Sequence, residues 1–173
     1  MKKLIAVVVL LTVVMALAVW QRHRILIVGL GSGAPPALLA AQDEGPLVQW
    51  YDDYFTIQTL GPRTFAIGEP RYAQQNFSYL IVGNERAVLF DAGPGFQNIR
   101  AVAESLTTKP IVFVPSHFHF DHTGNSVTFD EVAVVDLPYL RQRARNNQLT
   151  LSWSEHLGSA EGVSAPTLRI THW

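Results

Sequence analysis

Three histidines and one aspartate fall within six consecutive positions near the middle of the chain. They are His117, His119, Asp121 and His122, in the run of residues 115–125. In an extended segment, residues two apart point the same way, so His117 and His119 can approach one metal ion together. Asp121 and His122 follow in the next turn, where the backbone can direct them at a second ion. Imidazole nitrogen and carboxylate oxygen suit Zn²⁺, with Fe or Mn as alternatives.

The elements around this cluster predict a mixed α/β (α+β) domain. The four residues 111–114, directly before the cluster, are all apolar, as expected for a strand in the middle of a sheet covered on both faces. The remaining pattern predicts strands at residues 54–60, 63–67, 77–82, 87–90, 132–135 and 167–171 and helices at residues 96–106 and 139–147.

The spacing His-x-His-x-Asp-His resembles the signature of the metallo-β-lactamase superfamily. An Asp-Ala-Gly turn that begins at Asp91, at the end of a predicted strand, matches a second motif of that superfamily in order and in spacing. The resemblance covers roughly residues 54–136. It implies a four-layer αββα sandwich built from two similar halves, of which this chain supplies the first half and part of the second.

The resemblance also implies a role for each residue. His117 and His119 would bind the first metal ion, and Asp121 and His122 the second. Asp121 would also be catalytic, because it orients the attacking hydroxide and handles its proton. Asp91 would be a buried residue beside the ligands that steadies their loop. With one or two zinc ions, whose bound water has a pKa of about 7, the implied function is hydrolysis of an ester, thioester, lactone, lactam or phosphoester.

Members of the superfamily complete the site with ligands further along the chain, namely a third histidine, a bridging aspartate and a final histidine. After His122 this chain has only His156 and His172, neither of them in a Pro-Gly-His-Thr turn, and no aspartate follows Asp136. We therefore read the chain as an N-terminal portion that lacks the later motifs. Two hypotheses stay open: a metal-dependent hydrolase, and a catalytically silent truncated protein that binds metal weakly or needs a partner polypeptide.

The first 24 residues predict a membrane-targeting segment. Residues 4–20 are apolar apart from Thr12, and as a helix they would rise roughly 26 Å, the short end of a bilayer span. Lys2 and Lys3 precede the run, as in a signal anchor or signal peptide. We expect a protein that is anchored in a membrane or exported beyond the cytoplasm. Residues 25–53 would form a membrane-proximal linker, and residues 54–173 the incomplete metallo-β-lactamase-like domain.

Composition narrows the remaining classes of protein. Of the 173 residues, 48% are hydrophobic and 16% charged, which excludes disorder as the main state. There is no cysteine, so a disulfide framework, a thiolate metal site and a cysteine nucleophile are excluded. The 13 basic and 14 acidic residues form no clustered basic patch in the sequence, so no nucleic-acid partner is expected. The expected partner is a small-molecule substrate, and the oligomeric state stays open.

Overall fold

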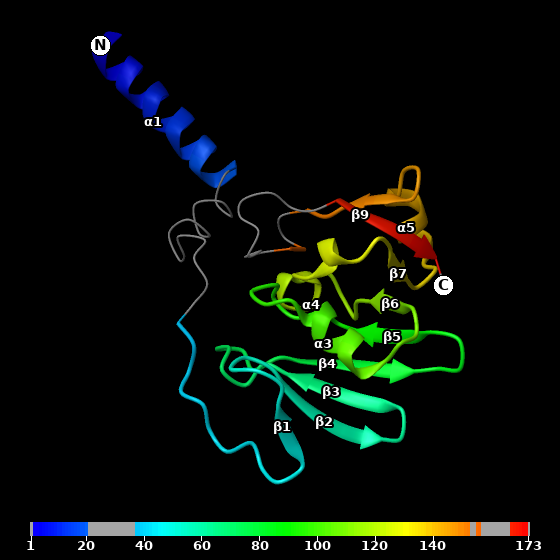
Figure 1. Ribbon diagram of the computed structural model, residues 1–173. Helices are drawn as coiled ribbons and strands as arrows, with labels where there is room; N and C mark the ends of the chain where they lie inside the picture. The colour runs from blue at the N-terminus through cyan, green and yellow to red at the C-terminus, as the bar shows by residue number, and fades with distance from the viewer. Residues whose placement is uncertain (1, 21–36, 153–154, 157–166, 173) are drawn as a thin grey trace. The chain divides into compact units, whose positions relative to one another are not determined.

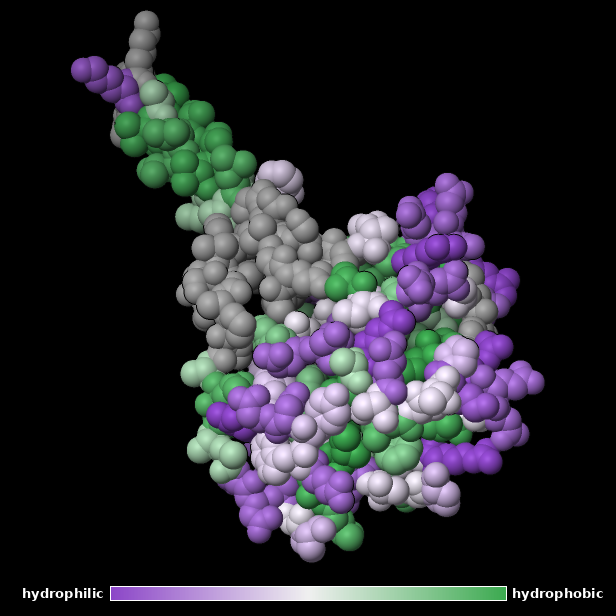
Figure 2. Space-filling view, in the orientation of Figure 1, coloured by the Kyte–Doolittle hydropathy of each residue, from purple (hydrophilic) through white to green (hydrophobic). Residues whose placement is uncertain are grey.

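The computed structural model describes residues 2–20, 37–152, 155–156 and 167–172, and contacts divide the chain into two units, Met1–Ala34 and Pro35–Trp173. The first unit contains α1 (Lys2–Trp20), along which Figure 2 shows apolar side chains at the surface. Among the described residues, no helix combines the length and the hydropathy that crossing a membrane requires. The predicted site lies in the second unit.

The second unit is built on a nine-stranded sheet with the strand order β1-β2-β3-β4-β5-β6-β7-β9-β8 (Figure 1). Strands β1 to β5 pair antiparallel in chain order, β5, β6, β7 and β9 pair in parallel, and β8 is antiparallel to β9. The strands are β1 (Val48–Trp50), β2 (Thr56–Gly61), β3 (Thr64–Gly68), β4 (Phe77–Val82), β5 (Ala87–Phe90), β6 (Ile111–Val114), β7 (Val132–Val134), β8 (Gln148–Thr150) and β9 (Thr167–His172).

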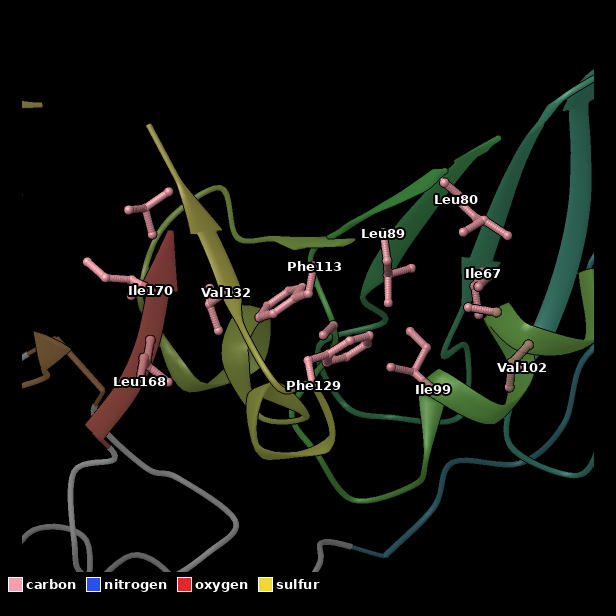
Figure 3. Packing of buried hydrophobic residues seen from close by; sticks show 14 of the residues in the cluster. Ile67, Leu80, Leu89, Ile99, Val102, Phe113, Phe129, Val132, Leu168 and Ile170 are labelled. Atoms are coloured by element: carbon pink, nitrogen blue, oxygen red, sulfur yellow. The ribbon is translucent and has the colours of Figure 1, made fainter. Parts of the chain in front are cut away.

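The core extends along the sheet, from Ile67 on β3 and Leu80 on β4 to Leu168 and Ile170 on β9 (Figure 3). Helix α3 (Ile99–Leu106) buries Ile99 and Val102, which its three-residue spacing places on one face. Its first turn is capped by the Asn98 side chain, which accepts a hydrogen bond from the Ala101 amide at 3.3 Å. The rings of Phe113 on β6 and Phe129 stack 5.1 Å apart. Strand β6, of which Phe113 is buried and the other three residues are half-buried, leads directly into the predicted ligands.

Strand β4 shows which face of the sheet is packed on the core and which is exposed. Its residues alternate, with Ser78 and Leu80 buried and Phe77, Tyr79 and Ile81 exposed. This period-two pattern is that of a strand with one face on the core. The opposite face presents three large apolar side chains, which are between 38% and 49% exposed.

The sequence predicted most of these elements. Strands β4, β5 and β6 have the predicted bounds. Strands β2 and β3 differ from the prediction by one or two residues at both ends, and β7 and β9 by one residue at their C-terminal end. Helix α3 begins three residues later than predicted. The predicted helix over residues 139–147 is wrong at its end: α5 (Pro138–Arg143) stops early, because Asn146 and Asn147 adopt φ of 51° and 58° in the turn before β8.

Four short elements were not predicted. Strands β1 and β8 have three residues each, and β1 falls within the range predicted as a linker. Such short strands exist through their pairing with β2 and β9, a long-range contact that local sequence does not encode. The other two are α4 (Phe120–Thr123), a single helical turn that begins directly after His119, and the 3₁₀ turn η1 (Ser126–Thr128).

Neighbouring residues on β4 give a matched test of this arrangement. Leu80 is 0% exposed and Ile81 is 48% exposed. We expect Leu80→Ala to lower the free energy of unfolding by about 2–5 kcal/mol, because it leaves a cavity in the core. Ile81→Ala should lower it by less than about 1 kcal/mol. Urea denaturation of both variants measures the difference, and equal losses would contradict the assignment of faces.

Candidate functional site

The site forms where the loop after β5 meets the loop after β6. Because β5 and β6 are parallel and Phe90 pairs with Val114, both loops leave the sheet at the same edge. The Ala92 amide donates to the His122 carbonyl at 3.0 Å, and the Gly124 amide donates to the Gly93 carbonyl at 2.9 Å. These backbone bonds dock residues 91–95 against the turn that carries the predicted ligands.

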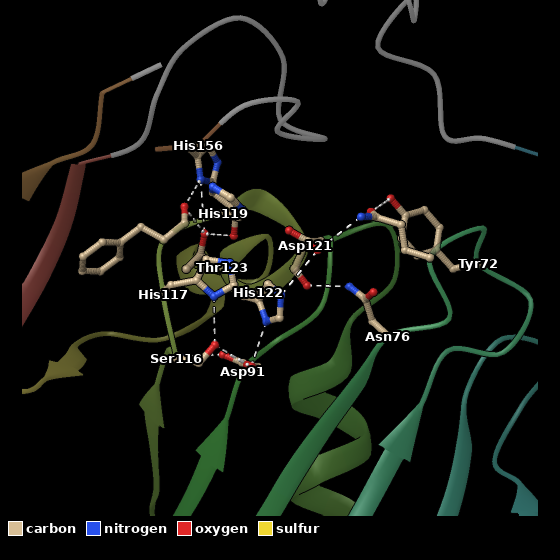
Figure 4. Close-up of polar contacts among 12 residues, drawn as sticks. Tyr72, Asn76, Asp91, Ser116, His117, His119, Asp121, His122, Thr123 and His156 are labelled. Carbon is tan, nitrogen blue, oxygen red and sulfur yellow. Dashed lines mark hydrogen bonds and ion pairs between the residues drawn. The ribbon is translucent and has the colours of Figure 1, made fainter. Parts of the chain in front are cut away.

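Asp91 is the polar centre of this junction (Figure 4). Its side chain is buried, and its backbone has a φ of 63°, the left-handed conformation that aspartate tolerates better than most residues. Oδ1 accepts from the Ser116 amide at 2.7 Å, and Oδ2 accepts from the Ser116 hydroxyl at 3.0 Å and lies 2.8 Å from His122 Nδ1. The buried carboxyl group is therefore bonded at both oxygens to the ligand loop.

These hydrogen bonds determine which nitrogen of the His117 and His122 rings carries the proton. A carboxylate oxygen accepts, so His122 donates from Nδ1 to Asp91. Since the Ser116 hydroxyl proton points to Asp91, His117 donates from Nδ1 to Ser116 Oγ, at 3.0 Å. Both rings then keep the Nε2 lone pair free for a metal ion, the arrangement in which the other ring nitrogen of a ligand histidine is hydrogen-bonded.

The three histidine rings lie close together. The ring centre of His117 is 4.6 Å from that of His119 and 4.1 Å from that of His122. Burial, and then the neighbouring His122 and His119, lower the pKa of His117. A lowered pKa favours the neutral ring, which is the form that binds a metal ion.

Asp121 is held from the opposite side by the loop between β3 and β4. Asn76 Nδ2 donates to the Asp121 carbonyl at 2.7 Å, and Gln74 Nε2 donates to its Oδ2 at 3.3 Å. The Tyr72 hydroxyl in turn donates to Gln74 Oε1 at 2.7 Å. The same Oδ2 lies 3.4 Å from His122 Nε2, so the two predicted ligands of the second metal ion are in contact.

Glu69, directly after β3, is a buried carboxyl group close to the same junction. It is 1% exposed, and among the described residues neither of its oxygens has a hydrogen-bond partner. Its Oε1 would lie 2.4 Å from a Cβ at Gly93, so the carboxyl group packs directly on the loop after β5. Burial, and then the charge of Asp121, raise the pKa of Glu69 to about 8. The buried hydroxyl of Tyr54 is also without a partner among the described residues.

The two later histidines have different positions. His156 is buried against the ligand loop, with Nδ1 at 3.2 Å from Thr123 Oγ1 and 3.4 Å from the Phe118 carbonyl. Burial is the main cause of the lowered pKa of His156. His172 lies in β9 with its backbone paired to Val134, and its side chain is outside the described residues.

The donor set suits a metal ion by its chemistry. His117, His119, Asp121 and His122 supply imidazole nitrogens and a carboxylate from one loop and the first turn of α4. Within the described part of the chain, no three histidine or acidic side chains already stand in the geometry of a formed metal site. The fit therefore rests on the type and proximity of the donors and on the bonds from Asp91 and Ser116 that hold two of the rings.

Comparison with known proteins points to one superfamily. The model of the metallo-β-lactamase superfamily matches residues 71–145. Two relatives named acyl-coenzyme A thioesterase MBLAC2 align over 129 residues, the Bos taurus protein at 29% identity and the Homo sapiens protein at 28%. A solved metallo-β-lactamase of Erythrobacter litoralis matches with a TM-score of 0.43 and 16% identity, over 55% of this chain and 46% of that chain.

The fold and site define a mixed α/β protein that carries a histidine- and aspartate-rich loop at the carboxyl ends of parallel strands. The matching family model and the relatives support the metallo-β-lactamase superfamily for the part of the chain that they cover. The alignments cover 66% of this chain and 45% of each mammalian relative, so the chain spans about half the length of the curated relatives it matches.

Several residues at this site were not predicted as site residues from the sequence. Glu69, Gln74 and Asn76 come from a segment more than 40 residues away in sequence and approach Asp121 only in the folded chain. Ser116 and Thr123 directly flank the predicted ligands, but their contacts with Asp91 and His156 also exist only in the folded chain. One local signal was available, since Glu69 places an acidic residue directly after an apolar strand, where a buried carboxyl group is unusual.

Glu69 gives a test through the pH dependence of stability. Its raised pKa means that the stability associated with the protonated carboxyl group is fully present below pH 4.5 and is lost as the pH rises towards 8. Relative to Glu69→Gln, we expect the free energy of unfolding of the wild type to fall by on the order of 4 kcal/mol over this range. Urea denaturation with chelator at pH 5 to 8 measures it, and parallel curves for the two proteins would contradict the burial of Glu69.

Proposed function

We propose that this chain carries the metal-binding half-site of a metal-dependent hydrolase. The observation that carries the proposal is the bracing of the ligand loop by Asp91, which bonds to Ser116 and His122 and so orients two of the imidazole rings. A loop with only a structural role does not require hydrogen bonds to its histidine rings, whereas a metal-binding histidine usually donates its other ring N–H to a group such as a carboxylate. His117 and His119 would bind one metal ion, and Asp121 and His122 a second.

The residues of the chain have distinct tasks in this proposal. A bound zinc ion would supply a Lewis acid and a water molecule of lowered pKa. Asp121 would orient the attacking water and accept its proton, and the amides of Gln74 and Asn76 hold Asp121 in place for that task. Asp91 would keep His122 in the tautomer that leaves Nε2 free.

A thioester is the first substrate class to test. The relatives named acyl-coenzyme A thioesterase support this choice, at 28% and 29% identity and over 45% of their length. Esters, lactones, lactams and phosphoesters remain in the proposal as further classes, because the same attack on a polarised carbonyl or phosphoryl centre serves all of them. The alternative, a silent protein that binds metal weakly or needs a partner polypeptide, is one outcome of the same experiment.

The test combines metal content with hydrolysis. We expect the full chain to bind zinc by elemental analysis and to release free thiol from an acyl-coenzyme A thioester, with loss of activity in a chelator and recovery with Zn²⁺. His117→Ala should lose metal and activity together, while the surface variant Arg141→Gln should keep both. A wild type without stoichiometric metal would overturn the proposal, and metal without hydrolysis of any of the five classes would favour the silent alternative.

We also propose that the apolar run at residues 4–20 directs the protein to a membrane or beyond the cytoplasm. Lys2 and Lys3 before the run support this. Expressed in bacteria, the full chain should fractionate with membranes or periplasm, and a chain that begins at residue 25 should stay in the cytoplasmic fraction. The same distribution for both chains would contradict the proposal.

A further inference from the structure

His156 contacts the ligand loop from outside the predicted ligand set. Its Nδ1 lies 3.2 Å from Thr123 Oγ1 and 3.4 Å from the Phe118 carbonyl, and its side chain is 1% exposed. Figure 4 shows the ring directly beside His119. The contacts thus reach the backbone directly before His119 and the side chain directly after His122, on both sides of three of the four predicted ligands.

The partners decide which group donates. The Thr123 hydroxyl donates to the His119 carbonyl at 2.9 Å and, over a longer 3.4 Å, to the Phe118 carbonyl, so its proton is already used. The Phe118 carbonyl accepts only. His156 must therefore donate from Nδ1 to Thr123 Oγ1 and the Phe118 carbonyl, and this one N–H joins two ends of the turn.

An ion pair between Arg143 and Glu155, supported by hydrogen bonds from Ser152, holds the turn that carries His156. The neighbouring Glu155 pairs through both oxygens with the Arg143 guanidinium of α5, with one N–O distance of 2.9 Å. The amide and hydroxyl of Ser152 donate to Glu155 Oε2 at 2.8 and 2.7 Å. Burial alone would raise the pKa of Glu155, but the bonds from Arg143 and Ser152 lower it to about 2. The His156 amide completes the turn by donating to the Ser152 carbonyl at 3.1 Å.

We propose that His156 is a positioning residue for the metal-ligand loop, residues 117–122, and that the Arg143–Glu155 ion pair holds His156 in place. The N–H of His156 fixes the carbonyl before His119 relative to Thr123, and thereby the direction in which the His119 ring leaves the backbone. The metal readouts of this inference rest on the proposed function, whereas its effect on the loop itself does not.

The first experiment uses Co²⁺ and Zn²⁺ with the full chain. We expect His156→Ala to weaken metal binding about 10-fold or more, the usual effect of removing a group that orients a ligand. The visible absorption of the Co²⁺ protein should shift in the same variant. His156→Asn is the rescue variant, because its amide N–H lies at the place of Nδ1, and it should stay close to the wild type. His156→Gln, whose amide lies one atom further out, should behave like His156→Ala.

The second experiment distinguishes loss of the Arg143–Glu155 ion pair from loss of any arginine on α5. Arg143→Gln should shift metal affinity in the same direction as His156→Ala. Arg141→Gln is the matched control, because Arg141 is on the same helix and pairs with Asp136 instead. It should leave metal affinity and the Co²⁺ spectrum unchanged.

A metal-free readout keeps this inference distinct from the proposed function. The His122 and Thr123 amides both donate to the His119 carbonyl at 3.0 Å, and their hydrogen exchange should be faster in His156→Ala than in the wild type and His156→Asn. Unchanged exchange in His156→Ala would overturn the inference, as would a His156→Asn variant as impaired as His156→Ala. If the wild type binds no metal, the proposed function fails, and exchange alone decides this inference.

Discussion

The close backbone contact between the loops that follow β5 and β6 is the constraint on which the site depends. At this contact the Gly124 amide donates to the Gly93 carbonyl at 2.9 Å. A Cβ at Gly124 would lie 2.0 Å from the carbonyl carbon of Pro94, and a Cβ at Gly95 would lie 2.5 Å from the Gly124 carbonyl oxygen. Neither position has room for a side chain, so the glycines allow the two loops to reach hydrogen-bonding distance.

Burial of Asp91 is a consequence of that contact. A buried carboxyl group is stable only when hydrogen bonds replace its lost hydration, and Asp91 receives them from the Ser116 amide, the Ser116 hydroxyl and His122. All three donors belong to the loop after β6. The docking of the loops and the orientation of the rings therefore support each other: if the loops separate, Asp91 loses its partners and His117 and His122 lose their fixed tautomers.

The sequence was most informative where chemistry and secondary structure are local. Apolar runs bounded by turns predicted β4, β5 and β6 at their observed ends, and the histidine spacing predicted which side chains would gather after β6. It did not predict contacts between distant segments. Gln74 and Asp121 are 47 residues apart, and Thr123 and His156 are 33 apart. Such pairs meet because of strand order and loop docking, and neither residue of a pair carries a local pattern that names the other.

The carboxyl groups around the predicted ligands link the stability of this fold to the metal binding that we propose. Three hydrogen-bond donors offset the cost of burying the Asp91 carboxyl group, and Gln74 donates to that of Asp121. Among the described residues, Glu69 has no partner at either oxygen. Its pKa is raised to about 8, first by burial and then by the charge of Asp121. A cation held by the histidines and Asp121 would oppose that charge and so reduce the repulsion between Asp121 and ionised Glu69. Because a ligand that binds only the folded state stabilises it, a metal ion at this place would offset part of the cost of burying Glu69.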